Sequence, residues 1–397
     1  MSFLQIPLGE LYDISSGLSK GKAFFGHGFP FLTFKTVFDS FFLPDELAEL
    51  ADTTEKERET CSILRGDVFL TRTSENTDEL GMSSVALKDY PNATFNGFTK
   101  RLRPKPCVQI NPLFASYWFR STAFRKQVKS MSVMTTRASL NTEMIRRLTM
   151  PFPTIEEQDA IANILYPLDE KMAINFTLNH HLRQMAQAIF KSWFVDFVPW
   201  GGAMPEDWRE GTLKDVCSYN IERIPVTALT TDTYISTENM SANKAGFVRA
   251  AILPAITQTT KFKSGDTLVS NIRPYFKKIV LCSFTGGCST DVLCFRPYKT
   301  TLSLYVYNAL YSDSFFDHIV SGSKGTKMPR GDKRQIMNYR LVVPSDCALE
   351  EFHTVTASLF ERIRANIEES TRLATLRNTL LPRLMSGELS VADLTVK

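Results

Sequence analysis

Two short motifs contain the residue types that a DNA adenine methyltransferase uses. The segment 24–28 (Phe-Phe-Gly-His-Gly) formally fits a cofactor-binding F-x-G-x-G motif, and 111–114 (Asn-Pro-Leu-Phe) is close to a catalytic N-P-P-[FY] motif. The glycines, however, do not follow a buried strand that opens a helix, as a nucleotide-binding turn requires. Asn111 lacks the second proline of the motif and fits a helix cap better. We therefore expect a loop and a helix start, and keep a stand-alone DNA adenine methyltransferase as the alternative function.

Histidine and cysteine offer no metal or nucleophile constellation in the sequence. His180 and His181 are adjacent, and neighbours on a helix point about 100° apart, so they do not form a two-ligand face. The seven cysteines include no C-x-x-C pair, and we expect them to be reduced and mostly buried. We accordingly expect no catalytic residue, no metal and no cofactor on this chain.

Lysine and arginine gather in two stretches, although the net charge is only +4. Residues 98–147 contain eleven of them against one acid, and residues 321–340 contain six against one. Paired basic stretches indicate a polyanion, and in DNA complexes such side chains neutralise phosphates while a few reach base edges. The predicted DNA-binding residues are Arg72, Arg101, Arg103, Arg137, Arg273, Lys277, Lys278, Lys324, Lys327 and Arg330.

Length and composition indicate a globular protein. The 397 residues should form two or three domains, and a hydrophobic content of 43% supplies an ordinary core. No apolar run reaches the roughly 18–20 residues that span a bilayer, so we expect no membrane partner. The start, MSFLQIPLGEL, lacks the basic head and apolar body of a signal peptide, so we expect a cytoplasmic protein.

The elements that position the basic residues occur twice, in the same order. In both halves a Gly-Asp turn leads into an apolar strand, and each strand ends near an arginine, Arg72 or Arg273. An Arg-Pro pair, an aromatic helix candidate and a polar basic loop follow, the loop being 134–137 in one half and 325–328 in the other. This repeated order indicates a duplication of a mixed strand-and-helix part of roughly 150 residues.

A long helix is predicted after each repeat. The first, 153–197, has apolar residues at steps of three and four: Ile161, Leu165, Leu168, Met172, Leu178, Leu182, Met185 and Ile189. The second, 350–385, has Val355, Leu359, Ile363, Ile367, Leu373, Leu376 and Leu380. Neither helix can bury its stripe alone, so we expect the two to pack on each other as a coiled coil. Pro167 predicts a kink or short break in the first helix, and Pro382 with Gly387 predicts the end of the second.

Five specific motifs are spread along the chain. They are T-I-E-E-Q at 154–158, I-A-N-I-L at 161–165, Q-A-I-F-K-S-W-F-V-D-F at 187–197, P-E-D-W at 205–208 and L-L-P-R-L-M-S-G-E-L at 380–389. Through them the whole chain resembles a specificity subunit of a type I restriction-modification system. The resemblance implies an α+β fold with two pseudo-two-fold-related, mixed α/β target-recognition domains separated by two long helices packed as an antiparallel coiled coil. The expected bounds are 1–153 and 201–344 for the target-recognition domains, and 154–200 and 345–397 for the helices.

The resemblance also implies a function. It is that of a non-catalytic subunit that reads a bipartite double-stranded DNA site, one domain per half-site, and docks two modification subunits and the restriction subunits. S-adenosylmethionine, ATP and Mg are then expected only on those partners. The expected partner-binding residues are Glu156, Glu157, Gln158, Phe190, Trp193, Phe194, Leu381 and Leu384. One departure is that the second copy of the Glu-Glu-Gln motif has the sequence Glu-Glu-Phe at 350–352. A purely structural coiled-coil scaffold would explain the helices but not the paired basic stretches.

Overall fold

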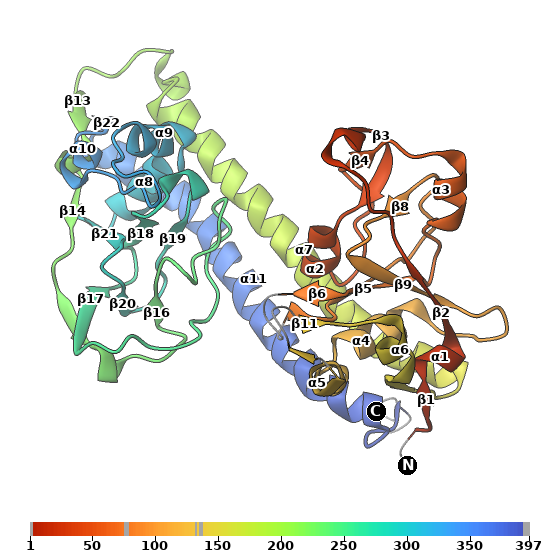
Figure 1. Cartoon of the computed structure of the whole chain (residues 1–397). Coiled ribbons are helices and arrows are strands. Elements are labelled where there is room, and N and C mark those ends of the chain that lie inside the picture. The colour runs from red at the N-terminus through yellow and green to blue at the C-terminus, as the bar shows by residue number, and fades with distance from the viewer. Residues whose placement is uncertain (1–2, 75–78, 132, 135–137, 392–397) are drawn as a thin grey trace. The chain divides into compact units, whose positions relative to one another are not determined.

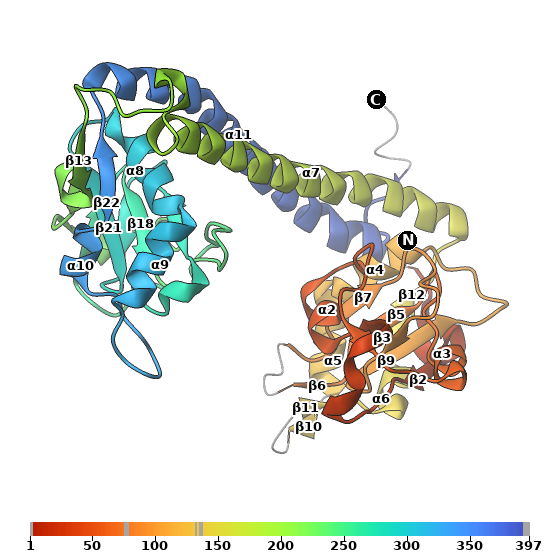
Figure 2. The same cartoon turned by 90° about the horizontal axis from the view of Figure 1, so that it is seen from above.

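The computed structural model describes residues 3–74, 79–131, 133–134 and 138–391. It contains two compact units: unit 1 combines Met1–Ala173 with Ser370–Lys397, and unit 2 is Ile174–Glu369. Each unit consists of a globular part of strands and short helices, with segments of two long helices, α7 (Ile155–Phe194) and α11 (Asp346–Ser386) (Figures 1 and 2). The expected α+β class with two mixed parts and two long helices is confirmed.

The globular part of unit 1 is built on a four-stranded antiparallel sheet with the order β2-β9-β5-β7. Its strands are β2 (Tyr12–Ser16), β9 (Thr99–Pro104), β5 (Val68–Thr71) and β7 (Ser83–Val85). The other strands are β1 (Gln5–Pro7), β3 (Phe25–Leu32), β4 (Leu50–Ala51), β6 (Thr73–Ser74), β8 (Thr94–Phe95), β10 (Val133–Met134), β11 (Ala138–Ser139) and β12 (Thr149–Pro151). The short helices are α1 (Leu8–Leu11), α2 (Phe34–Asp39), α3 (Glu55–Thr60), α4 (Pro112–Arg120), α5 (Thr122–Met131) and α6 (Thr142–Arg147).

The globular part of unit 2 repeats this plan on a sheet with the order β14-β21-β18-β19. Its strands are β14 (Cys217–Tyr219), β21 (Val292–Pro297), β18 (Thr267–Ser270) and β19 (Ile279–Leu281). A second sheet, in the order β15-β17-β20-β16, contains β15 (Arg223–Pro225), β17 (Gln258–Phe262), β20 (Gly286–Cys288) and β16 (Tyr234–Ile235). The remaining elements are β13 (Arg209–Thr212), which pairs with β22 (Arg340–Val343), and the helices α8 (Leu302–Tyr311), α9 (Asp313–Ser321) and α10 (Lys333–Met337).

The central strand of each sheet is buried on both faces. Val68 and Leu70 of β5 pack into one hydrophobic cluster and Phe69 into another, because successive side chains of a strand point to opposite faces. The equivalent strand β18 divides Leu268 and Val269 between two clusters in the same way. A strand that is covered on both faces carries a continuous apolar run, which is the pattern by which the sequence identified both strands.

The duplication is confirmed down to a buried ion pair in each unit. Asp67 accepts two hydrogen bonds from Arg103, Nε to Oδ1 at 2.8 Å and Nη2 to Oδ2 at 2.6 Å. Asp266 accepts the same two from Arg296, at 3.0 and 2.7 Å. The glycine before each aspartate has a positive φ, +92° at Gly66 and +89° at Gly265, so the turn that aims each carboxylate inward needs glycine. The repeated Gly-Asp and Arg-Pro pairs in the sequence are thus two halves of one contact.

Both methyltransferase-like motifs have structural explanations. The side chain of Asn111 caps α4, its Oδ1 accepting the N–H groups of Leu113 at 2.8 Å and Phe114 at 3.2 Å. The helix cap predicted at this position is therefore confirmed. Gly26 and Gly28, which we expected in a loop, instead lie in β3, where the pairing with β4 shifts register. A β-bulge needs the unusual backbone angles that glycine tolerates.

The two long helices are uninterrupted. Helix α7 continues through Pro167, so the break expected there does not occur, and α11 continues through Pro382 to Ser386. Gly387 ends α11 as predicted: its φ is +73°, and its N–H donates to the carbonyl of Leu384 at 3.2 Å. Pro167 and Pro382 have no backbone N–H, so each helix lacks one internal hydrogen bond. The free energy gained when the helices pack against their neighbours outweighs this cost.

Within each unit the segments of α7 and α11 run antiparallel. In unit 1 the Asp169 carboxylate accepts from Arg377, and Leu165 shares a cluster with Leu384. In unit 2 Asn175 donates to Glu369 at 2.8 Å and Asn366 to Asn179 at 2.8 Å, and Phe190 packs on Phe352. Along both segments the residue numbers on one helix rise as those on the other fall, which confirms the predicted antiparallel packing.

The predicted apolar stripe is only partly correct. Leu178, Met185, Val355, Ile367 and Leu376 are exposed, although the spacing assigned them to the interface. The asparagines at 175, 179 and 366 are buried there instead. An asparagine can occupy a helix interface when its amide finds partners across it, and counting apolar residues overlooks such positions.

Candidate functional site

Two of the predicted DNA-binding arginines hold the fold of unit 1. The Arg103 guanidinium binds Asp67 in the buried pair described above, and this partner raises the pKa of Arg103. Arg101 is buried, and its Nη1 donates to the Ser62 carbonyl at 2.6 Å. Because both guanidinium groups are engaged internally, neither is presented for a contact with a ligand.

Arg72 and Arg273 differ from the other half-buried arginines. Within the described residues, neither guanidinium makes a hydrogen bond, an ion pair or a ring contact. The Nε of each is shielded from solvent and has no partner. Other arginines of low exposure make at least one internal hydrogen bond: Arg101 donates through Nη1 although its Nε also lacks a partner, and Arg120 donates to the carbonyls of Ser83 at 2.7 Å and Ser40 at 3.0 Å. Each unit therefore has one anchored arginine whose charge is left uncompensated.

Both arginines lie where the central strand of the sheet ends. Arg72 directly follows β5; its N–H donates to the Phe98 carbonyl at 3.1 Å and its carbonyl accepts from Leu140 at 2.8 Å. Arg273 lies three residues beyond β18 and has a φ of +48°, with its N–H donating to the Pro329 carbonyl at 2.8 Å. Backbone hydrogen bonds hold both residues in place, so their side chains start from fixed points.

The two arginines are close, but not exact, structural equivalents. The N–H of Asn271 donates to Asp291 at 2.8 Å and its carbonyl accepts from Gly331 at 3.4 Å, which is the pattern Arg72 makes in unit 1. The true counterpart of Arg72 is therefore Asn271, and Arg273 lies two residues farther along. The two arginines were matched in the sequence because they are the same residue type at similar places. The strand register that distinguishes them is defined only by the backbone hydrogen bonds.

In unit 2 the polar basic loop belongs to a β-hairpin, and in unit 1 the strands on either side of the predicted loop pair with each other. In unit 2 the backbone of Lys324 and Arg330 pairs in both directions, at 2.9 and 3.0 Å, and Arg330 also bridges to Ile272 beside β18. In unit 1 β10 pairs with β11, and β11 with β6, so that a hairpin docks beside β5 in the same way. Predicted residue Arg137 lies outside the described residues. These pairings bring the unit 2 loop to the strand end that carries Arg273, and β11 of unit 1 to β6, which begins directly after Arg72.

The remaining predicted cations of unit 2 lie around this strand end. Lys324 and Lys327 are exposed, and Lys324 is only 3.8 Å from Asp332. Arg330 donates to Asp291 at 3.1 Å. Lys278 donates to the Thr237 carbonyl at 2.6 Å, and burial lowers the pKa of its ammonium group.

Lys277 shares one carboxylate with Lys244. Both ammonium groups lie 2.8 Å from Oδ1 of Asp313, and their hydrogen bonds lower the pKa of Asp313 to about 2. The aromatic residue Tyr275 is half-exposed between Arg273 and Lys277. Interleaved basic and aromatic side chains are typical of nucleic-acid surfaces.

Sequence reasoning missed Lys100, which lies near Arg72. Its Nζ donates to the hydroxyls of Ser16 at 2.7 Å and Thr142 at 3.0 Å. Burial and the charge of Arg72 lower the pKa of Lys100. The alternation of side chains along a strand could have predicted that Lys100 lies on the opposite face of β9 from Arg101 and Arg103. Unit 1 thus has two neighbouring cations, and among the described residues no carboxylate bridges them.

Most predicted partner-binding residues have internal roles. Glu157 accepts the Thr154 N–H at 2.9 Å, and buried Gln158 accepts the Asn111 N–H at 2.9 Å. The others are Phe190, Phe194 and Leu384, which are core residues; Trp193 and Leu381, which pack against the cores; and Glu156, which is exposed.

The second helix carries no structural copy of the Glu-Glu-Gln motif at 350–352. Gln158 donates its N–H to Thr154, and the equivalent first-turn bond joins Leu349 to Ser345 at 3.1 Å. Leu349 therefore takes the position of Gln158, three residues before Phe352. Helix α11 begins at Asp346, so the helix already includes the residues that precede Glu350.

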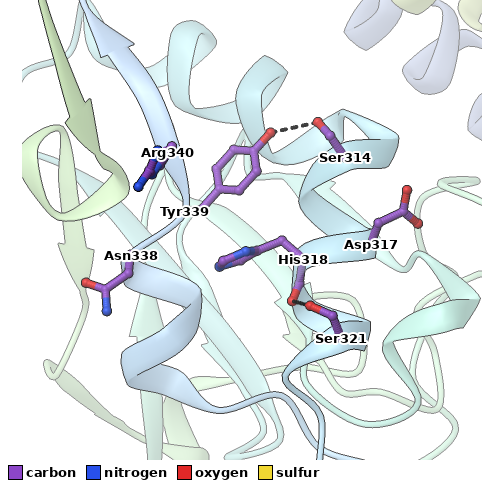
Figure 3. A pocket seen from close by; sticks show the side chains of 7 residues that line it. All are labelled: Ser314, Asp317, His318, Ser321, Asn338, Tyr339 and Arg340. Carbon is purple, nitrogen blue, oxygen red and sulfur yellow. Dashed lines mark hydrogen bonds between the residues drawn. The ribbon is translucent and has the colours of Figure 1, made fainter.

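A surface hollow of about 510 Å³ lies in unit 2, between α9 and the residues leading into β22 (Figure 3). Its lining is Ser314, Asp317, His318, Ser321, Asn338, Tyr339 and Arg340. His318 Nε2 lies 2.9 Å from the Gln335 carbonyl, and the Ser321 hydroxyl donates to the His318 carbonyl at 2.9 Å. Since no hydroxyl contacts the imidazole, the hollow lacks an activated nucleophile.

Two further features, a metal site and a membrane-spanning helix, are absent from the described part of the chain. No group of histidine, cysteine, aspartate and glutamate side chains there could hold a metal ion. No helix among the described residues is long and apolar enough to cross a bilayer.

Comparisons with known proteins agree with one another. Residues 7–184 match the family model described as type I restriction modification DNA specificity domain. The MjaIX specificity subunit of Methanocaldococcus jannaschii is 25% identical over 415 residues, covering 98% of this chain and 93% of that protein. The HindI specificity subunit of Haemophilus influenzae is 46% identical over 57 residues, 14% of this chain and 12% of that protein. A crystal structure of the S subunit of the type I restriction-modification system from M. genitalium has a TM-score of 0.56 at 14% identity, covering 97% and 96% of the two chains. That last likeness establishes the fold alone.

Proposed function

We propose that the chain is a type I restriction-modification specificity subunit and that it reads a bipartite double-stranded DNA site, one half-site per unit. The family model that matches residues 7–184 and the similarity to the MjaIX specificity subunit support this proposal. It is a DNA-recognition subunit and not the catalyst of the complex. The target-recognition parts in this proposal are 1–153 and 201–344, with 154–200 and 345–397 as the connecting helices.

One observation carries the proposal of two reading units. The duplicated fold presents, at the end of each central strand, an anchored guanidinium without a partner among the described residues, and a hairpin docks beside it. A half-buried guanidinium whose Nε is shielded and unpaired gains from a ligand that supplies a negative or acceptor partner. DNA provides both phosphates and base-edge acceptors to such groups.

The chemistry in this proposal belongs to partner subunits. Two modification subunits would bind S-adenosylmethionine and methylate adenine, and restriction subunits would use ATP and Mg to cut. On this chain, the residues assigned to docking that remain accessible are the exposed Glu156 and Glu157 at the start of α7 and the partly exposed Trp193 and Leu381. The buried ones, Gln158, Phe190, Phe194 and Leu384, would act by shaping the helix ends.

The stand-alone methyltransferase is not favoured. Asn111, the residue of its catalytic motif, caps α4 and accepts two backbone N–H groups on its Oδ1, and the glycines of its cofactor motif lie in a bulged strand. An asparagine committed to a helix terminus cannot also position a target adenine.

Methylation mapping in the host tests the proposal. Deleting the gene should abolish adenine methylation at one sequence motif that consists of two short parts with an unspecified gap. Replacing residues 201–344 with the matching segment of another specificity subunit should change one part of that motif only. A contiguous motif, or a change in both parts, would refute the assignment of one half-site to each unit. Purified chain alone should transfer no methyl group from labelled S-adenosylmethionine to DNA.

A further inference from the structure

The two unpartnered arginines are exceptions within their own chain. Arg101, Arg103, Arg120 and Arg296 are also half-buried or buried, and each donates to a carbonyl or a carboxylate. A shielded polar group without a partner is unfavourable, and folded proteins pair most of their buried polar groups. Arg72 and Arg273 differ from these arginines because the whole guanidinium lacks a hydrogen bond among the described residues, at the same end of the sheet in both units.

The accessible part of each guanidinium is its outer edge. Only Nε is shielded, whereas the two terminal nitrogens make no hydrogen bond or ion pair within the described residues and are not shielded from solvent. With Nε turned toward the protein, Nη1 and Nη2 are left as two donors in one plane. That edge fits a pair of acceptors such as O6 and N7 of guanine in the major groove, or two phosphate oxygens.

The surroundings favour the base over the phosphate. In unit 2 the exposed lysines Lys324 and Lys327 stand on the hairpin beside Arg273, and flexible lysines suit phosphates, which have no directional pattern to read. Arg273 is fixed by its backbone bond to Pro329 and by a positive φ, and Arg72 by its bonds to Phe98 and Leu140. A side chain that starts from a fixed point loses little freedom on binding and has a defined direction, as base reading requires.

We propose that Arg72 and Arg273 are specificity-determining residues, each reading one guanine in the major groove of its own half-site. This inference rests on the proposed function, and it assigns one G·C pair in each half-site to a single side chain. The exposed lysines of the unit 2 hairpin, Lys324 and Lys327, neutralise the neighbouring phosphates.

The experiment measures sequence preference and salt dependence together. The full complex, with its modification subunits, is incubated with a randomised duplex library, and bound sequences are compared between the parent and the variants Arg72→Gln and Arg273→Gln. Each variant should lose roughly 5- to 150-fold of the preference for G·C at one position of one half-site, and leave the other half-site unchanged. The dependence of binding on salt should stay close to that of the parent.

Lys327→Gln is the matched control, because Lys327 is an exposed cation of the neighbouring hairpin. It should weaken binding to all sequences alike and lower the salt slope by about 0.9, as expected for one lost phosphate contact. If Arg72→Gln or Arg273→Gln behaves like this control, the arginine contacts a phosphate and the inference is wrong. Unchanged sequence preference would also overturn it.

Two further arms keep the outcome decisive. Arg72→Lys and Arg273→Lys retain the charge and the long stem but lose the planar pair of donors, so they should lose the G·C preference at unchanged salt slope. They decide the question if a glutamine variant unfolds. If the parent complex shows no preference for a two-part site, the proposed function itself is wrong. If the parent prefers a two-part site but the arginine variants keep that preference, only the inference about Arg72 and Arg273 is wrong.

Discussion

The buried ion pair of unit 2 gives the sharpest test of the packing. The Asp266 side chain is 1% exposed and the Arg296 side chain 15%, and two hydrogen bonds of 3.0 and 2.7 Å join them. Removing one partner of such a pair costs about 3–5 kcal/mol, because the other charge is left buried and unpaired. We expect Arg296→Met to destabilise unit 2 by that amount, since Asp266 would keep only the Lys263 N–H at 2.9 Å and the Cys294 thiol at 3.7 Å.

The second mutation should partly rescue the first. Asp266→Asn on its own costs less, because Arg296 still reaches Glu222 at 2.6 Å and has a route to solvent. In the double variant Asp266→Asn/Arg296→Met no charge is left buried, so we expect it to be more stable than Arg296→Met alone by at least about 1 kcal/mol. Glu222→Gln is the control; Glu222 is 54% exposed, and its loss should cost less than about 1 kcal/mol.

Urea unfolding followed by tryptophan fluorescence measures these differences. Three of the four tryptophans, Trp193, Trp200 and Trp208, lie in unit 2 and pack in one aromatic cluster, so the signal reports mainly on that unit. A double variant as unstable as the sum of the two single variants would refute the reasoning. So would an Arg296→Met variant that loses less than about 1 kcal/mol.

The other predictions concern unit 1, the thiols and the acidic group beside the basic surface. Tyr117→Phe removes the 2.7 Å hydrogen bond to the Asp169 carboxylate and should destabilise unit 1 by about 1.5–3 kcal/mol, whereas Tyr166→Phe, which loses no hydrogen bond among the described residues, should change thermal unfolding little. An Ellman titration of the native protein should find two fast thiols, Cys107 and Cys347, and seven after denaturation; more than two fast thiols would contradict the burial of the other five. Asp313→Asn should steepen the salt dependence of DNA binding, because Lys244 and Lys277 lose their shared carboxylate; an unchanged slope would show that neither lysine meets phosphate. Because the pKa of Asp313 is lowered to about 2, its stabilising effect is present above its ordinary value and is lost as pH falls toward 2, so the acid unfolding curve of the variant should be flatter in that window.

Sequence reasoning recovered the duplication, the order of the elements and the long helices. These features depend on local signals: the apolar run of a strand buried on both faces, the asparagine and proline that start α4, and the glycine that ends α11. Each signal acts over a few neighbouring residues, so the sequence alone contains it. The repeated order then identified equivalent positions in the two halves to within a few residues.

Pairing across long sequence distances decided the rest. Arg72 and Arg103 are equally basic in the sequence, but Asp67 lies within hydrogen-bond distance of Arg103, while Arg72 has no such partner among the described residues. The asparagines at 175, 179 and 366 are buried because their amides meet across the helix pair, which no periodicity of apolar residues reveals. The sequence by itself thus determined that the chain is basic in two matching stretches. Only the tertiary structure decided which of these cations lack a partner among the described residues. The reason is that a hydrogen-bond partner must lie within about 3 Å, and the fold brings such partners together from distant parts of the chain.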